Sequence, residues 1–318
     1  MSNKLLIVGT VPPPIGGVSV HVSRLLKYLK YKKCDHIFCD YKKINVRIFS
    51  HFLNSSIIHI HANNPFFILF CIILSSIFFK KIIITIHGEF LYERNGLLHN
   101  FFEKLSVKFS DFPILLNKKD VDKALILNKN ALFISSFITP YNEPHLPKNI
   151  IDLVSKNKHK SIFCSNAYRM NFDKSGNEIY GILELTNYFN ISPQFYFILS
   201  DPSGEYLSYF NSNNIKLNNN ILIINSRHSF YRVLQISDCF IRNTITDGDS
   251  LSVRESLYLN KKVIATDCVS RPKSVILKKG SIDNAIKAYQ STQQNIFDKM
   301  ANGAEKILDL YNSIDKSS

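Results

Sequence analysis

The chain has 318 residues, which is too long for one ordinary domain and suits two domains of about 150 residues each. Hydrophobic residues make up 45% of it, so each half can build a core. The net charge is +14, and residues 1–150 hold most of the excess, with 19 Lys and Arg against 9 Asp and Glu. A positive surface suits anionic lipid, a phosphate-bearing substrate, nucleic acid or plain solubility, and charge alone does not choose among them.

The cysteines predict a reducing compartment. All six are scattered, without a Cys-x-x-Cys pair, which argues against a disulfide framework and against a zinc site. Most fall inside apolar runs such as Ser161–Ser165 and Asp238–Arg242, so we expect buried free thiols. The chain enters a strand-like run at Lys4, and no signal peptide is predicted. These features predict a cytoplasmic protein.

In the first half, short apolar runs alternate with helix-like stretches. This alternation predicts a parallel sheet with helices on both faces. Strands are expected at Leu5–Val8, His36–Cys39, Ile57–His61, Ile82–His87, Pro113–Asn117 and Leu132–Ile134, and helices at Val18–Leu29, Phe66–Phe79, Leu97–Phe109 and Lys119–Leu127.

The helix-like stretch Phe66–Phe79 is apolar except for Ser75 and Ser76. Its 14 residues would span about 21 Å as a helix, which is shorter than a hydrocarbon core of about 30 Å. A buried helix, partly at an interface, is therefore favoured over a membrane span.

Three prolines in Pro140–Pro147 interrupt the pattern and predict a linker. We therefore divide the chain into domains 1–147 and 148–318, and expect that the last helix packs back on the first domain. Two such α/β halves place a ligand site in a cleft at the carboxyl ends of their strands. In the second half, strands are expected at Ser161–Cys164, Phe195–Ser200, Ile221–Asn225, Cys239–Arg242 and Val263–Thr266, and helices at Asn177–Tyr188, Ser203–Phe210, Phe230–Ile236, Ser250–Leu259 and from Ile282.

The loop after the first strand contains three prolines and enters a helix at Gly16 and Gly17. Glycines there let backbone N–H groups approach a phosphate or a sugar, although a plain strand-to-helix turn would use them too. The loop lacks the Gly-x-Gly-x-x-Gly fingerprint, which argues against a nicotinamide-dependent dehydrogenase. His21 falls inside the helix, where a structural role is expected.

A polar triplet that begins at His87 ends the apolar run from Ile82. At the carboxyl end of a parallel strand, His87 would face the ligand. Its imidazole could hydrogen-bond a sugar hydroxyl or stabilise charge as a glycosidic bond breaks. A histidine satisfied locally, with a structural role alone, is the alternative.

The most informative stretch is Asp238–Asp267, in which a strand leads through an acidic loop into a helix and a second strand. Backbone N–H groups at the helix start can hold a diphosphate, because the helix dipole favours negative charge there. The residues expected to contribute to this site are Gly248, Asp249, Ser250 and Leu251.

Two carboxylates lie on either side of this helix start. Asp247 precedes the helix, and Glu255 lies about one and a half turns inside it. A nucleotide-sugar requires such an arrangement, with one acid for the sugar and one for the ribose. The pair Ser252 and Glu255 also fits a helix capping box, and this alternative stays open.

The stretch resembles the Glu-x7-Glu signature of family-four retaining glycosyltransferases, with Asp247 as the first acid and Glu255 as the second. Lys262–Asp267 resembles the strand that follows in that family, where Asn260-Lys261-Lys262 here replaces Gly-x-Pro. The Gly16-Gly17 loop and the His87-Gly88 strand end recur at the same relative places. The resemblance therefore covers most of the chain.

This resemblance implies the GT-B fold, an α/β architecture of two Rossmann-like domains whose parallel sheets face each other across a cleft. It also implies transfer with retention of anomeric configuration, and no catalytic metal or other cofactor. The first domain would serve the acceptor and the second would bind the nucleotide-sugar.

The resemblance also assigns roles. Glu255 would bind the donor ribose and Asp247 the donor sugar. An Arg and a Lys after the first strand of the second domain would neutralise the leaving diphosphate. Arg169 and Lys174 are the candidates, although Ser175 separates Lys174 from the glycine that follows directly in the family.

We therefore expect a transferase that moves a hexose or an acetamido-hexose, with a UDP-sugar favoured as donor, to a lipid-linked or growing surface polysaccharide such as an O-antigen or a capsule. Lys104 and Lys108, with Lys118 and Lys119 after them, predict a peripheral position on an anionic membrane, at the inner face of the plasma membrane. A nucleotide-sugar epimerase of the same fold is the alternative. Nucleic acid is not expected as a partner, because the chain contains no recognisable nucleic-acid-binding module.

Overall fold

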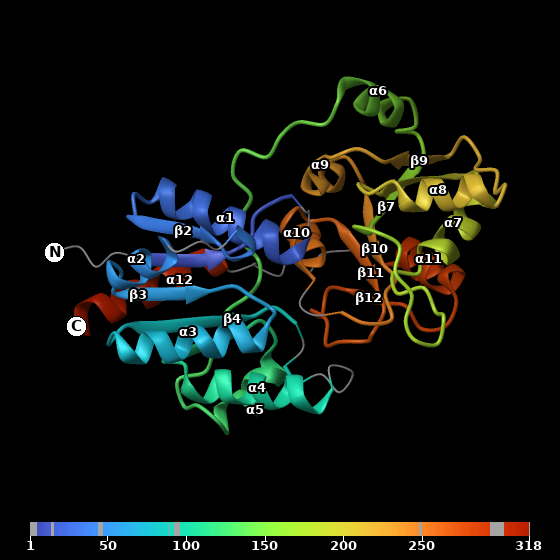
Figure 1. Ribbon diagram of the computed structural model, residues 1–318. Coiled ribbons are helices and arrows are strands. Elements are labelled where there is room, and N and C mark those ends of the chain that lie inside the picture. The colour runs from blue at the N-terminus through green and yellow to red at the C-terminus, as the bar shows by residue number, and fades with distance from the viewer. Residues whose placement is uncertain are drawn as a thin grey trace. The chain divides into compact units, whose positions relative to one another are not determined.

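The computed structural model describes residues 5–13, 16–43, 47–88, 90–91, 96–247, 250–292 and 302–317. The chain divides into two compact units, shown in Figure 1. Unit 1 comprises Met1–Tyr141 with Ala301–Ser318, and unit 2 comprises Asn142–Met300. The sequence expectation divided the chain after residue 147 and returned the last helix to the first domain, whereas the structural boundary follows Tyr141.

Unit 1 is built on six parallel strands in the order β2-β1-β3-β4-β5-β6. Because the strands are parallel, their carboxyl ends lie at one edge of the sheet. The strands are β1 (Leu5–Gly9), β2 (His36–Asp40), β3 (Ile57–Ile60), β4 (Lys81–Ile86), β5 (Phe112–Leu115) and β6 (Leu132–Phe133).

Helices cover both faces of this sheet (Figure 1). Side chains alternate along a strand, so Leu5 and Ile7 pack with α1 (Gly17–Tyr31) and α12 (Gly303–Ser317). Leu6 and Val8 face the other layer. That layer comprises α2 (Arg47–Leu53), α3 (Pro65–Ile77), α4 (Leu97–Phe109) and α5 (Lys118–Leu125), and a short 3-10 helix, η1 (Tyr41–Lys43), precedes α2.

Helix α3, for which the sequence favoured a buried helix partly at an interface, is buried along one face only. Ile68, Cys71 and Ile72 pack into the core. Its opposite face is an exposed apolar stripe, because the sequence continues hydrophobic all round the helix. In the part of the chain that the structure describes, no helix is long and apolar enough to cross a membrane.

Unit 2 has a second sheet of six parallel strands, in the order β12-β11-β10-β7-β8-β9. Helices α6, α9 and α10 pack on one face, and α7, α8 and α11 on the other. The strands are β7 (Ser161–Asn166), β8 (Phe195–Ser200), β9 (Ile221–Ile224), β10 (Cys239–Arg242), β11 (Lys262–Ala265) and β12 (Ile276–Leu277). The helices are α6 (Lys148–Lys156), α7 (Ile182–Asn190), α8 (Glu205–Ser212), α9 (Phe230–Gln235), α10 (Leu251–Tyr258) and α11 (Ile282–Ser291).

Several elements differ from the sequence expectation. Helices α2 and α6 and strand β12 were not predicted, and the C-terminal stretch forms two helices, α11 and α12, which belong to different units. Helix α7 begins at Ile182, five residues later than expected. The reason is that Glu178 accepts hydrogen bonds from the N–H groups of Ile182 and Leu183, so it caps the first turn from a position outside the helix.

The cysteines are free, as expected. Cys71, Cys164 and Cys239 are buried, whereas Cys34 and Cys39 are partly exposed. The expectation of burial is wrong for Cys268, which lies in a loop after β11 and is exposed.

A close backbone approach seats α12 on unit 1, and it requires glycine at position 303. The Gly303 N–H donates to the carbonyl of Phe137 at 2.7 Å, and a Cβ would collide with the carbonyl oxygen of Ser135. We expect Gly303→Ala to lower the free energy of unfolding by about 1–3 kcal/mol, measured by thermal or urea unfolding. Gly17→Ala is the control, because its Cβ would meet no atom within 4 Å. Equal stability of Gly303→Ala and the parent would contradict this account.

Candidate active site

The diphosphate-binding helix start predicted from the sequence is the amino end of α10. Ser250 is the N-cap, and its hydroxyl accepts a hydrogen bond from the N–H of Val253 at 3.4 Å. The capping-box reading of Ser252 is therefore wrong, because Ser252 lies inside the helix, where its carbonyl accepts the Ser256 hydroxyl. The first N–H groups of a helix lack partners within it, so this end favours anions. The predicted residues Gly248 and Asp249 lie outside the described residues.

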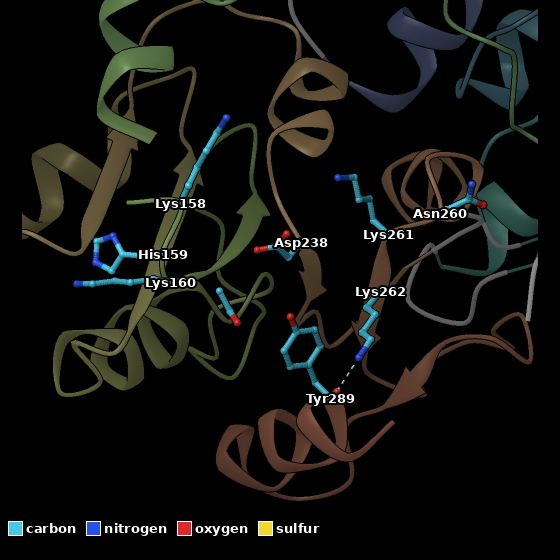
Figure 2. A pocket seen from close by; sticks show the side chains of 9 residues that line it. Lys158, His159, Lys160, Asp238, Asn260, Lys261, Lys262 and Tyr289 are labelled. Atoms are coloured by element: carbon cyan, nitrogen blue, oxygen red, sulfur yellow. Dashed lines mark hydrogen bonds between the residues drawn. The ribbon is translucent and has the colours of Figure 1, made fainter. Parts of the chain in front are cut away.

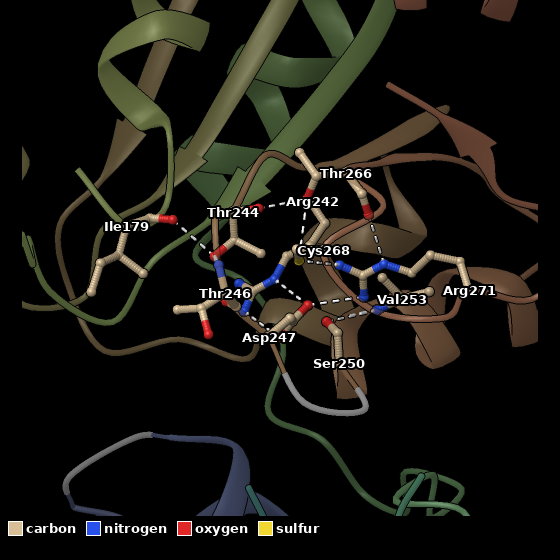
Figure 3. Close-up of polar contacts among 10 residues, drawn as sticks. All are labelled: Ile179, Arg242, Thr244, Thr246, Asp247, Ser250, Val253, Thr266, Cys268 and Arg271. Atoms are coloured by element: carbon tan, nitrogen blue, oxygen red, sulfur yellow. Dashed lines mark hydrogen bonds and ion pairs between the residues drawn. The ribbon is translucent and has the colours of Figure 1, made fainter. Parts of the chain in front are cut away.

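Asp247 precedes this helix and is held by two arginines (Figure 3). Arg242, which ends β10, donates from Nε and Nη2 to the carboxylate at 3.1 and 2.9 Å. Arg271, from the segment after β11, donates from Nη1 at 2.9 Å. The side chains of Asp247, Arg242 and Arg271 are only 6%, 15% and 3% exposed. We call these three residues the arginine cluster.

The arginine cluster carries a net positive charge, because one carboxylate faces two guanidinium groups. Burial alone would raise the pKa of Asp247, but Arg242 and Arg271 outweigh it and hold that pKa below its ordinary value. Burial likewise opposes the charge on Arg242, yet Asp247 raises the pKa of Arg242 overall. Arg242 also lies over the ring of Tyr180, 5.3 Å from its centroid. The cluster is thus a fixed cationic group, and its acid, Asp247, lies three residues before the α10 N-cap.

The loop after β10 is tied to the loop after β7, the neighbouring strand. Thr244 Oγ1 donates to the carbonyl of Ile179 at 2.8 Å, and the Ile245 N–H donates to the same oxygen at 3.0 Å. Asn243 Nδ2 donates to the carbonyl of Gly181 at 3.0 Å. Gly181 has φ +60°, and a Cβ there would collide with Asn243, so both conformation and space require glycine. These bonds fix the carboxyl edge of the sheet.

Arg169 and Lys174 lie on this same loop after β7, and both side chains are exposed. The loop is ordered by its own hydrogen bonds, since Asp173 accepts the N–H groups of Ser175 and Asn177, each at 2.9 Å. The structure therefore brings both predicted cations to the edge that carries α10 and the arginine cluster. Their role in catalysis stays a prediction.

Glu255 and Leu251 belong to α10 itself. Glu255 is buried, with 3% of its surface exposed, and Leu251 is partly exposed at the first position of the helix. The predicted contact of Glu255 with a donor ribose stays a prediction.

The sequence analysis assigned no role to Arg242 or Arg271. A partner for Arg242 could have been expected, because this arginine ends the apolar run of β10 and a buried charge needs a counter-ion. Arg271 gives no such signal, since it lies 24 residues from Asp247 in a segment without clear periodicity.

In unit 1, His87 follows β4 and belongs to a group of buried or partly buried histidines. Its Nε2 lies 3.0 Å from Nδ1 of His61, which follows the adjacent strand β3. His59 contacts the hydroxyls of Tyr311 and Thr85 through its two ring nitrogens. His21 extends from α1, and its Nδ1 donates to the carbonyl of Ser136 at 2.9 Å. This packing is consistent with the structural role expected for His21.

Burial determines the charge of these rings. It lowers the pKa of His87 and of His61 well below the usual value, and neighbouring histidines lower both further. Burial lowers the pKa of His59 to about 3. At neutral pH the His87 imidazole is therefore uncharged, and it acts as a hydrogen-bonding group and not as a cation.

Gly16 is the N-cap of α1, and Gly17 is its first residue. The Gly16 N–H donates to Ser19 Oγ at 3.0 Å. A Cβ on either glycine would meet no atom within 4 Å, so packing within the protein does not require glycine at these two positions. This open space is compatible with the close approach of a ligand that the sequence predicted.

A separate hollow of about 500 Å³ lies at the opposite, amino edge of the unit 2 sheet (Figure 2). Three of its four lysines bind the protein itself: Lys160 donates to the carbonyl of Pro193, Lys261 to that of Gln235 and Lys262 to that of Tyr289. Ligands of open parallel sheets bind at the carboxyl edge. We therefore place the candidate site at the arginine cluster and not in this hollow.

No family model matches the chain. A glycosyltransferase of Methanocaldococcus jannaschii, itself uncharacterised, is 30% identical over 74 residues, which is 23% of this chain and 18% of that protein. The chain therefore matches less than a fifth of the length of this relative.

Solved structures resemble the whole chain. HepE of Anabaena, in complex with UDP and glucose, has a TM-score of 0.68 at 11% identity, covering 98% of this chain and 100% of HepE. Sucrose-phosphate synthase of Thermosynechococcus elongatus has a TM-score of 0.69 at 14% identity, covering 99% and 100%. A candidate UDP-N-acetylglucosamine 2-epimerase of Listeria monocytogenes has a TM-score of 0.65 at 12% identity, covering 100% and 98%. At such identities the likeness is one of fold, and the expected GT-B fold class is confirmed.

We expect Asp247→Asn to destabilise unit 2 by about 3–5 kcal/mol at pH 7, because it leaves two buried arginines without their counter-ion. The lowered pKa of folded Asp247 means that its contribution is present above the unfolded value of about 3.9 and is lost as the pH falls through the folded value. The difference in melting temperature between variant and parent should therefore shrink from pH 7 to pH 3.

The control is Asp283→Asn, which removes an exposed acid paired with Lys287 and should change stability by less than about 0.5 kcal/mol. Equal melting temperatures of Asp247→Asn and the parent at pH 7 would show that the arginine cluster does not stabilise the fold.

Proposed function

We propose that the protein is a retaining glycosyltransferase similar to family four, which transfers a hexose or an acetamido-hexose from a UDP-sugar without a catalytic metal or other cofactor. The acceptor is a lipid-linked or growing surface polysaccharide, such as an O-antigen or a capsule. The observation that carries this proposal is the arginine cluster, whose Asp247 lies three residues before the N-cap of α10, at the carboxyl edge of a parallel sheet.

This edge suits a departing diphosphate. Negative charge grows on the diphosphate as the glycosidic bond breaks, and a helix amino end with fixed cations stabilises that charge without a metal ion. Arg242 and Arg271 are preorganised by Asp247, so they need not reorganise during the reaction. In this proposal Arg169 and Lys174 add exposed positive charge from the loop after β7.

The remaining assignments come from the resemblance. Glu255 binds the donor ribose, and the N–H groups of Gly248–Leu251 bind the diphosphate. Asp247 contacts the donor sugar directly or through the arginines that it holds. Gly16 and Gly17 leave room for a ligand at α1, and His87 offers a neutral imidazole to a sugar hydroxyl.

Two comparisons support a transferase. HepE was solved with UDP and glucose, and the archaeal relative is named as a glycosyltransferase. The epimerase-like neighbour from Listeria supports the alternative, a nucleotide-sugar epimerase of the same fold.

An anionic membrane is the partner we propose for unit 1. In α3, Phe66, Phe70, Ile73 and Ile77 follow one another at helical spacing, and each is 47–59% exposed. Helix α4 packs beside α3, with the rings of Phe66 and Phe102 4.3 Å apart. It adds exposed apolar and basic side chains, namely Leu97, Leu98, Phe101, Lys104 and Lys108. An exposed apolar face with lysines at its margin is complementary to anionic lipid, and we propose a cytoplasmic protein docked on the inner face of the plasma membrane.

The donor assignment predicts that a UDP-sugar raises the melting temperature of the protein with EDTA present. We expect Glu255→Ala to abolish this shift and Glu255→Gln to weaken donor affinity at least about 10-fold, because a charged hydrogen-bond acceptor is lost. Binding is measured by calorimetry over a panel of nucleotide-sugars. Asp283→Asn is the matched acidic control, and unchanged affinity in Glu255→Gln would refute the assignment.

The same preparation separates transferase from epimerase. Incubation with UDP-N-acetylglucosamine alone should yield no epimer by NMR. Accumulation of an epimeric nucleotide-sugar without acceptor would favour the alternative.

The membrane proposal predicts sedimentation with vesicles containing phosphatidylglycerol and weaker binding to phosphatidylcholine alone. The double substitution Phe70→Glu with Ile73→Glu should reduce vesicle affinity about 10-fold or more, because it removes two apolar anchors. Ile191→Glu alters an 81% exposed apolar residue of unit 2 and is the control. If the double variant sediments like the parent, this face does not bind the membrane.

A further inference from the structure

Three histidines of unit 1 converge from separate elements. His21 comes from α1, His61 follows β3 and His87 follows β4. Each offers one ring nitrogen, and these three nitrogens lie within 4.8 Å of one another. In the part of the chain that the structure describes, no other group of three His, Cys, Asp or Glu side chains is arranged in this way.

The spacing of the three rings suits one metal ion. Metal–nitrogen bonds of about 2.0–2.1 Å in tetrahedral geometry place the ligand nitrogens about 3.4 Å apart and the ring centroids about 5 Å apart. The centroid distances are 5.5 Å for His21–His61, 5.1 Å for His21–His87 and 5.3 Å for His61–His87. Nδ1 of His61 and Nε2 of His87 are already 3.0 Å apart. Small side-chain rotations would therefore complete a three-nitrogen set.

A backbone carbonyl orients the His21 ring as such groups do around known metal sites. The carbonyl of Ser136 accepts a hydrogen bond from Nδ1 of His21, so the proton lies on Nδ1 and the lone pair of the neutral ring lies on Nε2. A backbone carbonyl on the non-ligating nitrogen is the usual second contact of a metal-bound histidine. His59 is not a ligand, because Tyr311 and Thr85 engage both of its nitrogens.

Metal ligation requires the neutral imidazole, which has a lone pair on one ring nitrogen. Nε2 of His61 is fully buried and has no hydrogen-bond partner among the described residues, so the hydrogen bonds of this ring do not fix which of its nitrogens carries the proton. The histidines therefore do not form a hydrogen-bond network that is complete in itself.

We propose that His21, His61 and His87 bind one first-row transition-metal ion, with Zn²⁺ as the best match for three imidazoles in tetrahedral geometry. Water supplies the fourth ligand on the side of His87, which is the most exposed of the three. Sugar transfer itself is proposed to need no metal ion. On the proposed function, the ion withdraws a ring nitrogen of His87 from the substrate, so metal occupancy switches transfer off.

Cobalt is the probe for the test, because tetrahedral Co²⁺ with nitrogen ligands absorbs strongly in the visible. We expect the full chain, stripped with EDTA, to bind one Co²⁺ with this spectrum and to release it when Zn²⁺ is added. His61→Gln and His21→Gln should each weaken Zn²⁺ affinity at least about 100-fold by calorimetry, since each loses a direct ligand. His145→Gln, an exposed histidine of unit 2, should bind like the parent.

Absence of stoichiometric Co²⁺ binding, an octahedral spectrum, or equal affinity in His61→Gln would overturn the proposal. Melting temperatures without metal identify any variant that does not fold, and the parent spectrum still decides the case. Zn²⁺ should reduce transfer and EDTA restore it. If the metal binds without any effect on transfer, the metal site stands and its regulatory role is refuted. If the protein has no transferase activity, the proposed function alone is refuted.

Discussion

The carboxyl edge of the unit 2 sheet depends on one buried carboxylate shared by two arginines. Asp247 links the end of β10, through Arg242, to the segment after β11, through Arg271. Arg271 also donates from Nε to the carbonyl of Thr266, so the same side chain fixes the exit from β11. Helix α10 begins at Leu251, four residues after Asp247, so the ion cluster places fixed charge close to the start of that helix in the sequence.

In contrast to the charged arginines at the carboxyl edge of unit 2, the strand ends of unit 1 carry neutral side chains. Its strand ends carry histidines, and burial makes them neutral, because a histidine pKa lies close enough to neutrality for desolvation to remove the proton. An arginine cannot escape burial in this way, since its pKa is too high, and it needs a permanent counter-ion. The unit 2 sheet therefore carries a cationic cluster at its carboxyl edge, and the unit 1 sheet carries neutral, hydrogen-bonding histidines after β3 and β4.

The sequence predicted the parts of this fold that hydrophobic patterning controls. Most strands and the helices that cover them were found, since burial on a parallel sheet imposes continuous apolar runs. Two-residue β12 and seven-residue α2 were missed because such short elements contain too few residues for a period to appear. The late start of α7 depends on Glu178, whose side chain caps the helix from a turn, and a propensity argument does not detect that bond.

At the site, the sequence located the loop and the helix correctly but not the partners of its acid. The interpretation of Asp247 started from the spacing to Glu255, whereas its contacts come from a strand end and from a segment 24 residues later. Likewise, four histidines between positions 21 and 87 come together only because β3 and β4 are neighbours and α1 packs beside them. Contacts between distant segments depend on the order of the strands in the sheet, and the sequence pattern does not predict that order.

The return of α12 to unit 1 has a consequence for how the chain is made. Residues 142–300 form a continuous unit that can complete its core as soon as it leaves the ribosome. Residues 1–141, although synthesised first, lack the side chains of Ile307, Tyr311 and Ile314, which pack with Leu5 and Ile7. Until α12 is synthesised, that face of the unit 1 sheet is covered by α1 without α12, so the segment made first is the one that matures last.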